Sequence, residues 1–255
     1  MAIIKNEIPI LEYDDNQMSV IMPTHEHLDF EVPEKVVFPF LGETVEEYAK
    51  AHGAVEIATF VSMTKLYPIY IIDYKGEKIG LCQAPVGSAP AAQILDWLIG
   101  YGAKKIISAG SCGALVDLSE NTFLVPTRAL RDEGTSYHYL PPSRYVELNQ
   151  NVLKSIEQTF QKLNLTYQEC MTWTTDGFYR ETKEKVAYRK EEGCSVVEME
   201  CAALAACAEF RGVEFGQILY TADTLANTED YDERDWGDAS LEKALWICLE
   251  LIREM

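Results

Sequence analysis

Two carboxylates, Glu198 and Glu200, lie two residues apart where a short apolar run leads into an alanine-rich stretch. The apolar run, residues 195–197, predicts a buried strand, and residues 201–210 predict a helix that follows it. Many α/β enzymes bind their substrates at such junctions. Glu198, Met199 and Glu200 are therefore candidate site residues. The alternative is that Glu200 only occupies the first turn of the helix, where a negative charge is favourable.

A third carboxylate, Asp223, follows the apolar run of residues 218–220, which predicts the end of a second buried strand. Burial raises the pKa of a carboxyl group, and a raised pKa is what a general acid at neutral pH requires. Asp223 is therefore a candidate catalytic acid. The competing interpretation is a turn or helix cap that Asp223 forms with Thr224.

The composition indicates a folded enzyme rather than a disordered or nucleic-acid-binding chain. Of the 255 residues, 47% are hydrophobic and 25% are charged, and no linker divides them, so we expect a single domain over residues 1–255. The formal net charge of -19 disfavours binding to nucleic acid, because phosphate backbones require basic surfaces. Any anionic substrate must therefore be bound by a local cluster of donors.

The cysteines and the apolar segments indicate where the protein works. The seven cysteines are scattered without a CxxC pair, and they are expected to be buried free thiols in a reducing compartment. No apolar stretch approaches the ~20 residues that cross a bilayer. The opening residues carry no basic segment followed by an apolar run. We expect a soluble, cytoplasmic protein without a membrane partner.

Strands and helices alternate along most of the chain, which predicts a mixed β-sheet covered by helices on both faces. The predicted strands are residues 19–22, 55–62, 69–74, 78–84, 105–108, 121–130, 167–174, 195–197 and 215–222. The predicted helices are residues 44–51, 89–101, 149–163, 182–192, 201–210 and 241–254. Residues 74–77 are expected to form a hairpin turn, residues 110–113 a turn near a ligand, and Pro126 a bulge.

Five segments resemble, in the same order, those of the nucleoside phosphorylase superfamily, which includes purine nucleoside phosphorylases, uridine phosphorylases and related nucleosidases. They are residues 104–115 (KKIISAGSCGAL), 131–139 (RDEGTSYHY) and 175–179 (TDGFY), the Glu198-Met199-Glu200 region, and the strand that ends at Asp223. The resemblance extends from about residue 19 to the end of the chain. It implies an α/β fold with a central mixed sheet flanked by helices, and cleavage of an N-glycosidic bond.

The resemblance implies roles for the residues at the base. Asp223 corresponds to the acid that protonates or hydrogen-bonds the imidazole-ring nitrogen of a purine, and Arg234 to an arginine that steadies this acid. Phe178 corresponds to the aromatic residue on which the base stacks. An ordinary loop arginine and a core phenylalanine are the alternatives. Pyrimidine-specific members carry Gln and Arg where this chain has Thr182 and Glu184, which favours a purine.

The sugar side follows in the same way. Glu200 corresponds to the carboxylate that accepts hydrogen bonds from the ribose 2′ and 3′ hydroxyls, and Met199 to the side chain that lies against the sugar. Charged acceptors strengthen such hydrogen bonds, and negative charge near the ring favours a cation-like transition state. Family members often borrow a histidine from the partner's N-terminus for the 5′ hydroxyl. No histidine precedes His25 here, so recognition of the 5′ group stays open.

The phosphate side departs from the family pattern. The loop expected after the first strand, residues 23–28, has neither the glycine nor the arginine of the phosphorylases, and Ser108 replaces a further arginine. Ser111 and the backbone at Gly110 remain as phosphate donors, together with Lys65, which corresponds to an arginine that a neighbouring subunit supplies. Phosphate binds better to bidentate guanidinium groups than to these donors.

Glu26 supports a hydrolytic alternative, because the hydrolases of the superfamily place a glutamate after the first strand to orient water. His25 and His27 flank Glu26, but two histidines without a further ligand do not predict a metal site, and a polar surface loop is the simplest interpretation. Phosphorolysis of a purine ribonucleoside, with phosphate as co-substrate and no other cofactor, is favoured over hydrolysis. A non-catalytic nucleoside-binding protein is the third hypothesis. The resemblance also implies a homo-oligomer, either a dimer or a hexamer of dimers.

Overall fold

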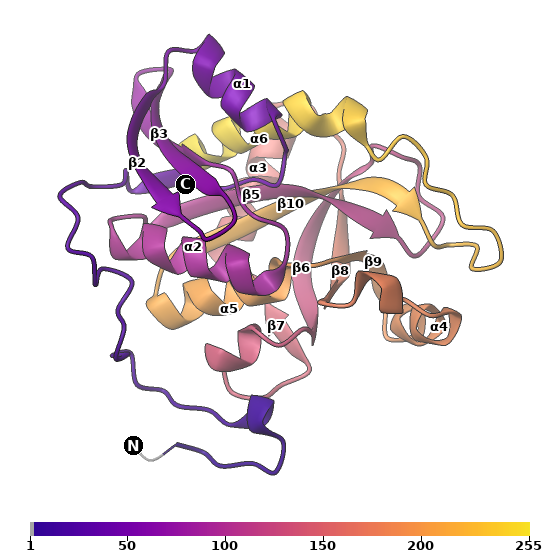
Figure 1. The fold of residues 1–255 in the computed structure, drawn as a ribbon. Coiled ribbons are helices and arrows are strands. Elements are labelled where there is room, and N and C mark those ends of the chain that lie inside the picture. The colour runs from indigo at the N-terminus through magenta and orange to yellow at the C-terminus, as the bar shows by residue number, and fades with distance from the viewer. Residues whose placement is uncertain (1–2) are drawn as a thin grey trace.

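The computed structural model describes residues 3–255, in which one mixed sheet lies between two groups of helices (Figure 1). The strands are β1 (Lys35–Val37), β2 (Val55–Val61), β3 (Leu66–Tyr74), β4 (Glu77–Cys82), β5 (Lys105–Ala114), β6 (Phe123–Asp132), β7 (Tyr145–Glu147), β8 (Gln168–Thr175), β9 (Cys194–Glu198) and β10 (Glu214–Thr224). The helices are α1 (Thr44–Ala51), α2 (Ser88–Gly100), α3 (Gln150–Lys162), α4 (Lys183–Glu191), α5 (Cys201–Arg211) and α6 (Leu241–Glu254). The predicted fold class is confirmed.

The strands follow the order β10-β6-β8-β9-β5-β1-β4-β3-β2, with β7 added to β6. Strand β10 also pairs in parallel with β5, so β5, β9, β8, β6 and β10 close into a ring. Helices α1, α3 and α6 pack on one face of the sheet, and α2 and α5 pack on the other (Figure 1). The long strands β5 and β10 are buried along nearly their whole length, and they bring distant parts of the chain together at one edge of the ring.

Most predicted elements are confirmed within a few residues, because local chemistry defines their ends. Helix α3 begins where the Asn149 side chain accepts hydrogen bonds from the backbone N–H groups of Asn151 and Val152. Tyr74 pairs with Glu77 in the predicted hairpin between β3 and β4. The pairing of β6 with β8 shifts register between Pro126 and Arg128, as expected for a proline-associated bulge. All seven cysteines are buried and free.

Two predictions about local structure are wrong. Residues 19–22 form no strand, and Val20 and Ile21 are 106% and 71% exposed, because no neighbouring strand pairs with this segment. The first strand of the sheet is β1, which pairs in parallel with β4 and β5. Residues 110–113 are not a turn but a continuation of β5, because β10 and β9 supply hydrogen-bonding partners there.

One glycine has a clear steric reason. Gly102, after α2, has φ +130°, and a Cβ atom there would lie 2.5 Å from the carbonyl oxygen of Val32. Only glycine fits this close approach without strain. The contact connects the end of α2 with the segment that leads into β1. Among residues 3–255, no helix has the length and apolar character needed to cross a membrane.

Candidate active site

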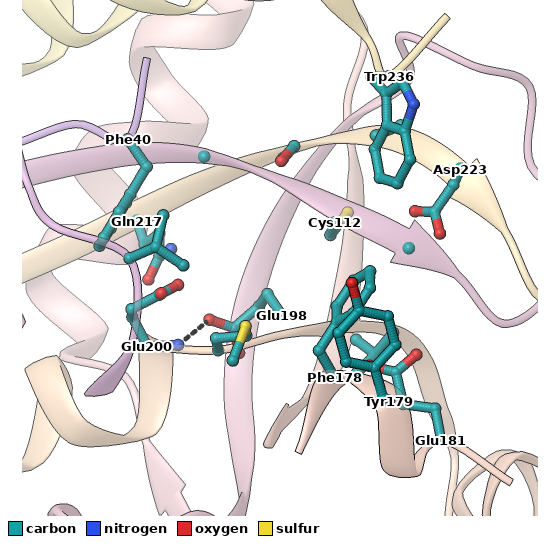
Figure 2. A pocket seen from close by; sticks show the side chains of 17 residues that line it. Phe40, Cys112, Phe178, Tyr179, Glu181, Glu198, Glu200, Gln217, Asp223 and Trp236 are labelled. Atoms are coloured by element: carbon teal, nitrogen blue, oxygen red, sulfur yellow. Dashed lines mark hydrogen bonds between the residues drawn. The ribbon is translucent and has the colours of Figure 1, made fainter. Parts of the chain in front are cut away.

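A cavity of about 440 Å³ opens where β5, β9 and β10 meet the start of α5. Figure 2 shows two ends of this cavity. Phe40, Gln217 and Glu200 lie at one end, and Asp223, Trp236, Phe178, Tyr179 and Glu181 lie at the other. The fold therefore brings most of the residues that the sequence predicted for base and sugar to a single cavity. They are Phe178, Glu198, Met199, Glu200 and Asp223, from segments up to about 45 residues apart, whereas Arg234 does not line the cavity. We call the two ends the sugar end and the base end.

Glu198 is held entirely by protein groups. Its Oε1 accepts hydrogen bonds from the hydroxyls of Thr172 and Thr174 at 3.1 and 2.6 Å, and its Oε2 accepts from the backbone N–H groups of Glu200 and Cys201, both at 2.7 Å. The last two bonds satisfy N–H groups at the start of α5. Glu198 therefore lines the cavity but caps the helix, and this positions Glu200.

Glu200 lies at the sugar end and is 7% exposed. Its Oε1 accepts a hydrogen bond from the backbone N–H of Gly87, which precedes α2. Burial, together with the neighbouring Glu198 carboxyl, raises the pKa of Glu200 to about 8. Met199 lines the same wall, and its carbonyl accepts a hydrogen bond from the Ser88 hydroxyl at 2.6 Å. This end therefore offers a buried carboxyl and a thioether side by side.

Asp223 lies at the base end, where β10 is about to leave the sheet. Burial raises the pKa of Asp223, against a hydrogen bond of 3.0 Å that its Oδ2 accepts from the Tyr231 hydroxyl. Its Oδ1 lies against Gly113, where a Cβ atom would approach it to 3.1 Å. The small size of Gly113 thus leaves room for the carboxyl group. Burial thus moves the pKa of this carboxyl in the direction that general-acid catalysis requires.

Arg234 lies close to the base end without a hydrogen bond to the Asp223 carboxyl. Its guanidinium donates to the carbonyls of Leu118 at 2.8 Å and Ala222 at 3.4 Å, the second of which immediately precedes Asp223. Its charge lowers the pKa of Asp223, but burial has the larger effect. Arg234 therefore stabilises the backbone next to Asp223. The residue that hydrogen-bonds the Asp223 carboxyl directly is Tyr231.

Aromatic side chains flank the base end. Phe178 is 42% exposed and packs edge-on against Tyr179, with ring centroids 5.0 Å apart, and Trp236 lies across the cavity from them (Figure 2). An exposed phenylalanine of this kind is not part of the core. Faces and edges of these rings are therefore available to a flat, partly apolar ligand.

Glu181 is a site residue that the sequence analysis missed. It lines the base end beside Asp223, and burial together with the Asp223 charge raises its pKa to about 7. Its position three residues after Phe178 could have indicated that it lies near the base. It was overlooked because residues 180–185 are mostly charged, which is typical of a solvent-exposed segment.

The part of the cavity beside Gly110 and Ser111, in the second half of β5, differs from the expected phosphate site. Gly110 and Ser111 line the cavity as predicted, but the Phe40 ring packs against Gly110, where a Cβ atom would meet it at 3.4 Å. Ser108 is fully buried and does not line the cavity. Among the described residues that line the cavity, four are carboxylic acids and none is lysine, arginine or histidine.

Three other predicted residues lie elsewhere in this chain. Lys65 is exposed on the connection between β2 and β3, with its Nζ 5.5 Å from the Tyr67 ring centroid. Glu26 lies on an exposed turn and does not line the cavity, so its predicted place after the first strand was wrong because that strand is β1. The segment after β1 is instead residues 38–43, which brings Phe40 to the cavity. His25 lines a separate cavity next to α2.

Comparisons with known proteins find a matching family, relatives and a similar solved structure. The family model described as the phosphorylase superfamily matches residues 35–253, beginning at the first residue of β1. A guanosine phosphorylase from Halorubrum lacusprofundi is 26% identical over 185 residues, covering 72% of this chain and 76% of the relative. A DeoD-type purine nucleoside phosphorylase from Colwellia psychrerythraea is 27% identical over 216 residues, covering 82% and 90%. The crystal structure of an AMP nucleosidase from Bacteroides thetaiotaomicron matches with a TM-score of 0.71 at 23% identity, covering 88% of this chain and 89% of that one.

Proposed function

The chain belongs to the phosphorylase superfamily, and on this basis we propose that it cleaves the N-glycosidic bond of a purine ribonucleoside with water as the nucleophile. The observation that carries the choice of nucleophile is the cavity wall, where four carboxylic acids and no basic side chain are found among the described residues. A phosphate dianion at this wall would find no guanidinium or ammonium group among the described lining residues to offset its charge. Water meets no such penalty.

The base end supports a purine. Asp223 delivers its proton to the imidazole-ring nitrogen of the base as the bond to the sugar breaks, so that both electrons of the C–N bond leave with a neutral base. Burial raises the pKa of Asp223, and this shift favours the protonated form that the step requires. The rings of Phe178 and Trp236 hold the flat base between them.

The sugar end supports a riboside. Glu200 accepts hydrogen bonds from the ribose hydroxyls, and its charge stabilises the positive charge that develops on the ring. Binding of these two donors, in place of water, lowers the high pKa of Glu200 because hydrogen bonds to the charged form favour it. The water oxygen then forms the new bond at the anomeric carbon, its proton leaves to solvent, and solvent returns a proton to Asp223.

Phosphorolysis is the second candidate, and the names of the two relatives favour it, since both are phosphorylases. It requires a cation from outside this cavity wall. Lys65 is the residue for that role, supplied by a neighbouring copy of the chain in a homo-oligomer. Phosphate is then a co-substrate, bound by Lys65 together with Ser111 and the Gly110 backbone.

Product analysis distinguishes the two reactions. Inosine and adenosine are incubated with the protein, with and without phosphate, and the products are separated by chromatography. We expect free base and free ribose at the same rate in both conditions. Ribose 1-phosphate formed only with phosphate refutes the hydrolytic proposal and supports the second candidate. Absence of any product, with nucleoside binding by calorimetry, refutes both.

A further inference from the structure

Two buried polar atoms on the neighbouring strands β5 and β10 have no hydrogen-bond partner among the residues that the structure describes. They are Oγ of Ser108 on β5 and Oε1 of Gln217 on β10. The two residues are register partners in the parallel pairing of these strands, so their side chains lie on the same face of the sheet. Ser108 is 0% exposed and Gln217 is 1% exposed.

Buried polar atoms of this kind normally have a partner, because leaving a buried acceptor unpaired costs free energy. Most of the other buried polar side chains around the site are paired, as the four hydrogen bonds to Glu198 illustrate. Two unpaired oxygens on neighbouring strands therefore mark a place for a small polar molecule. Gln217 borders the cavity directly, and Figure 2 shows it at the sugar end with Phe40 and Glu200.

The surroundings decide what kind of molecule fits. Phe40 covers Gly110 and narrows this end of the cavity, and Ser108 and Gln217 are both neutral. A carboxamide and a hydroxyl each accept and donate hydrogen bonds, as a water molecule does. An anion here would find no compensating positive charge among the described residues that line the cavity. A small neutral molecule matches the site better than phosphate does.

We propose that the Gln217 carboxamide, supported by Ser108, binds the water molecule that attacks the anomeric carbon. This inference rests on the proposed hydrolysis and names the residue that holds its nucleophile. Gln217 accepts a hydrogen bond from the water, which directs a lone pair of the water oxygen towards the sugar. The bond from this oxygen to carbon forms as the C–N bond breaks, and the water proton leaves to solvent as described above.

Gln217→Met tests the inference, because methionine keeps the length of the side chain and removes its hydrogen bonds. Gln83→Met is the matched control. The Oε1 of Gln83 is also buried without a partner among residues 3–255, but Gln83 does not line the cavity. Turnover of inosine and adenosine, nucleoside affinity by calorimetry and melting temperature are measured for both. In water–methanol mixtures, the ratio of methyl riboside to ribose shows how strongly the site selects water.

We expect Gln217→Met to lower turnover by at least about tenfold while nucleoside affinity stays within about threefold of the parent protein. The share of methyl riboside should rise. Without the Gln217 oxygen, the site no longer favours water, with its second O–H group, over methanol, which carries a methyl group there. Gln83→Met should match the parent in turnover and in the share of methyl riboside. If Gln217→Met does not fold, Gln217→Thr, which keeps a hydroxyl but shortens the side chain, should show the same changes.

The outcomes separate the inference from the proposed function. Free ribose from the parent, with unchanged turnover and methanol ratio in Gln217→Met, overturns the role of Gln217 and leaves hydrolysis standing. Weaker nucleoside binding with unchanged turnover overturns it as well, because Gln217 then contacts the sugar instead of the nucleophile. Ribose 1-phosphate as the only sugar product from the parent overturns both.

Discussion

The raised pKa of Glu200 makes a prediction about stability that is independent of any substrate. Burial and the Glu198 carboxyl raise the pKa of Glu200 from its ordinary 4.5 to about 8 in the folded protein. In the unfolded chain, both causes are absent. Glu200→Gln removes the titration while keeping the shape of the side chain and an oxygen that accepts the hydrogen bond from the Gly87 N–H.

Proton binding determines whether the free energy of unfolding rises or falls with pH. Below pH 4.5 both states hold the proton of Glu200, and above pH 8 both have lost it. Between these values the folded protein binds the proton more tightly, so the free energy of unfolding falls as the pH rises. Each pH unit contributes at most about 1.4 kcal/mol, and we expect a total of roughly 2 to 5 kcal/mol from this residue.

The assay is urea denaturation of the parent and of Glu200→Gln at several pH values between 5 and 8.5, in the absence of nucleoside. Glu181 and Asp223 also have raised pKa values, so both proteins should lose stability as the pH rises. The difference between the two curves isolates Glu200. As the pH rises, we expect the free energy of unfolding of Glu200→Gln to increase relative to that of the parent. Glu191→Gln, which replaces an exposed carboxylate, is the control, and its free energy of unfolding should follow the same pH dependence as that of the parent. Parallel curves for Glu200→Gln would contradict the reasoning.

Three further predictions concern the reaction and the assembly. Asp223→Asn should lower turnover by ~10² to 10⁴ while nucleoside affinity by calorimetry is largely kept; turnover within a few-fold of the parent would remove Asp223 from the mechanism. Gly113→Ala should also reduce turnover, because the new Cβ would lie 2.9 Å from Leu225 and 3.1 Å from the Asp223 carboxyl; a crystal structure with Asp223 unmoved and full activity would count against it. If neighbouring copies share sites, light scattering should find a homo-oligomer, and Lys65→Ala should lower its activity. An active monomer would rule out shared sites.

The sequence determined most of the secondary structure, and it singled out the carboxylates that we propose for the base and the sugar. Hydrophobic periodicity and capping residues act over a few positions, so helices such as α3 and the hairpin between β3 and β4 were predictable. Asp223 and Glu200 were predictable as well, because each is a carboxylate at the end of an apolar strand. The placement of residues 19–22 failed because a short apolar run does not show whether a neighbouring strand will pair with it.

Only the tertiary structure decided what surrounds these carboxylates. Strands β5 and β10 pair across about 110 residues of sequence, and this pairing brings Ser108 opposite Gln217 and Gly113 next to Asp223. Phe40 reaches the cavity because β1, and not residues 19–22, begins the sheet. Register and burial arise from contacts between distant segments. They determine the pKa values of the site carboxyls and leave the Ser108 and Gln217 oxygens without partners among the described residues. The sequence thus singled out the two carboxylates that we propose as general acid and ribose-binding group, and the fold decided what surrounds them.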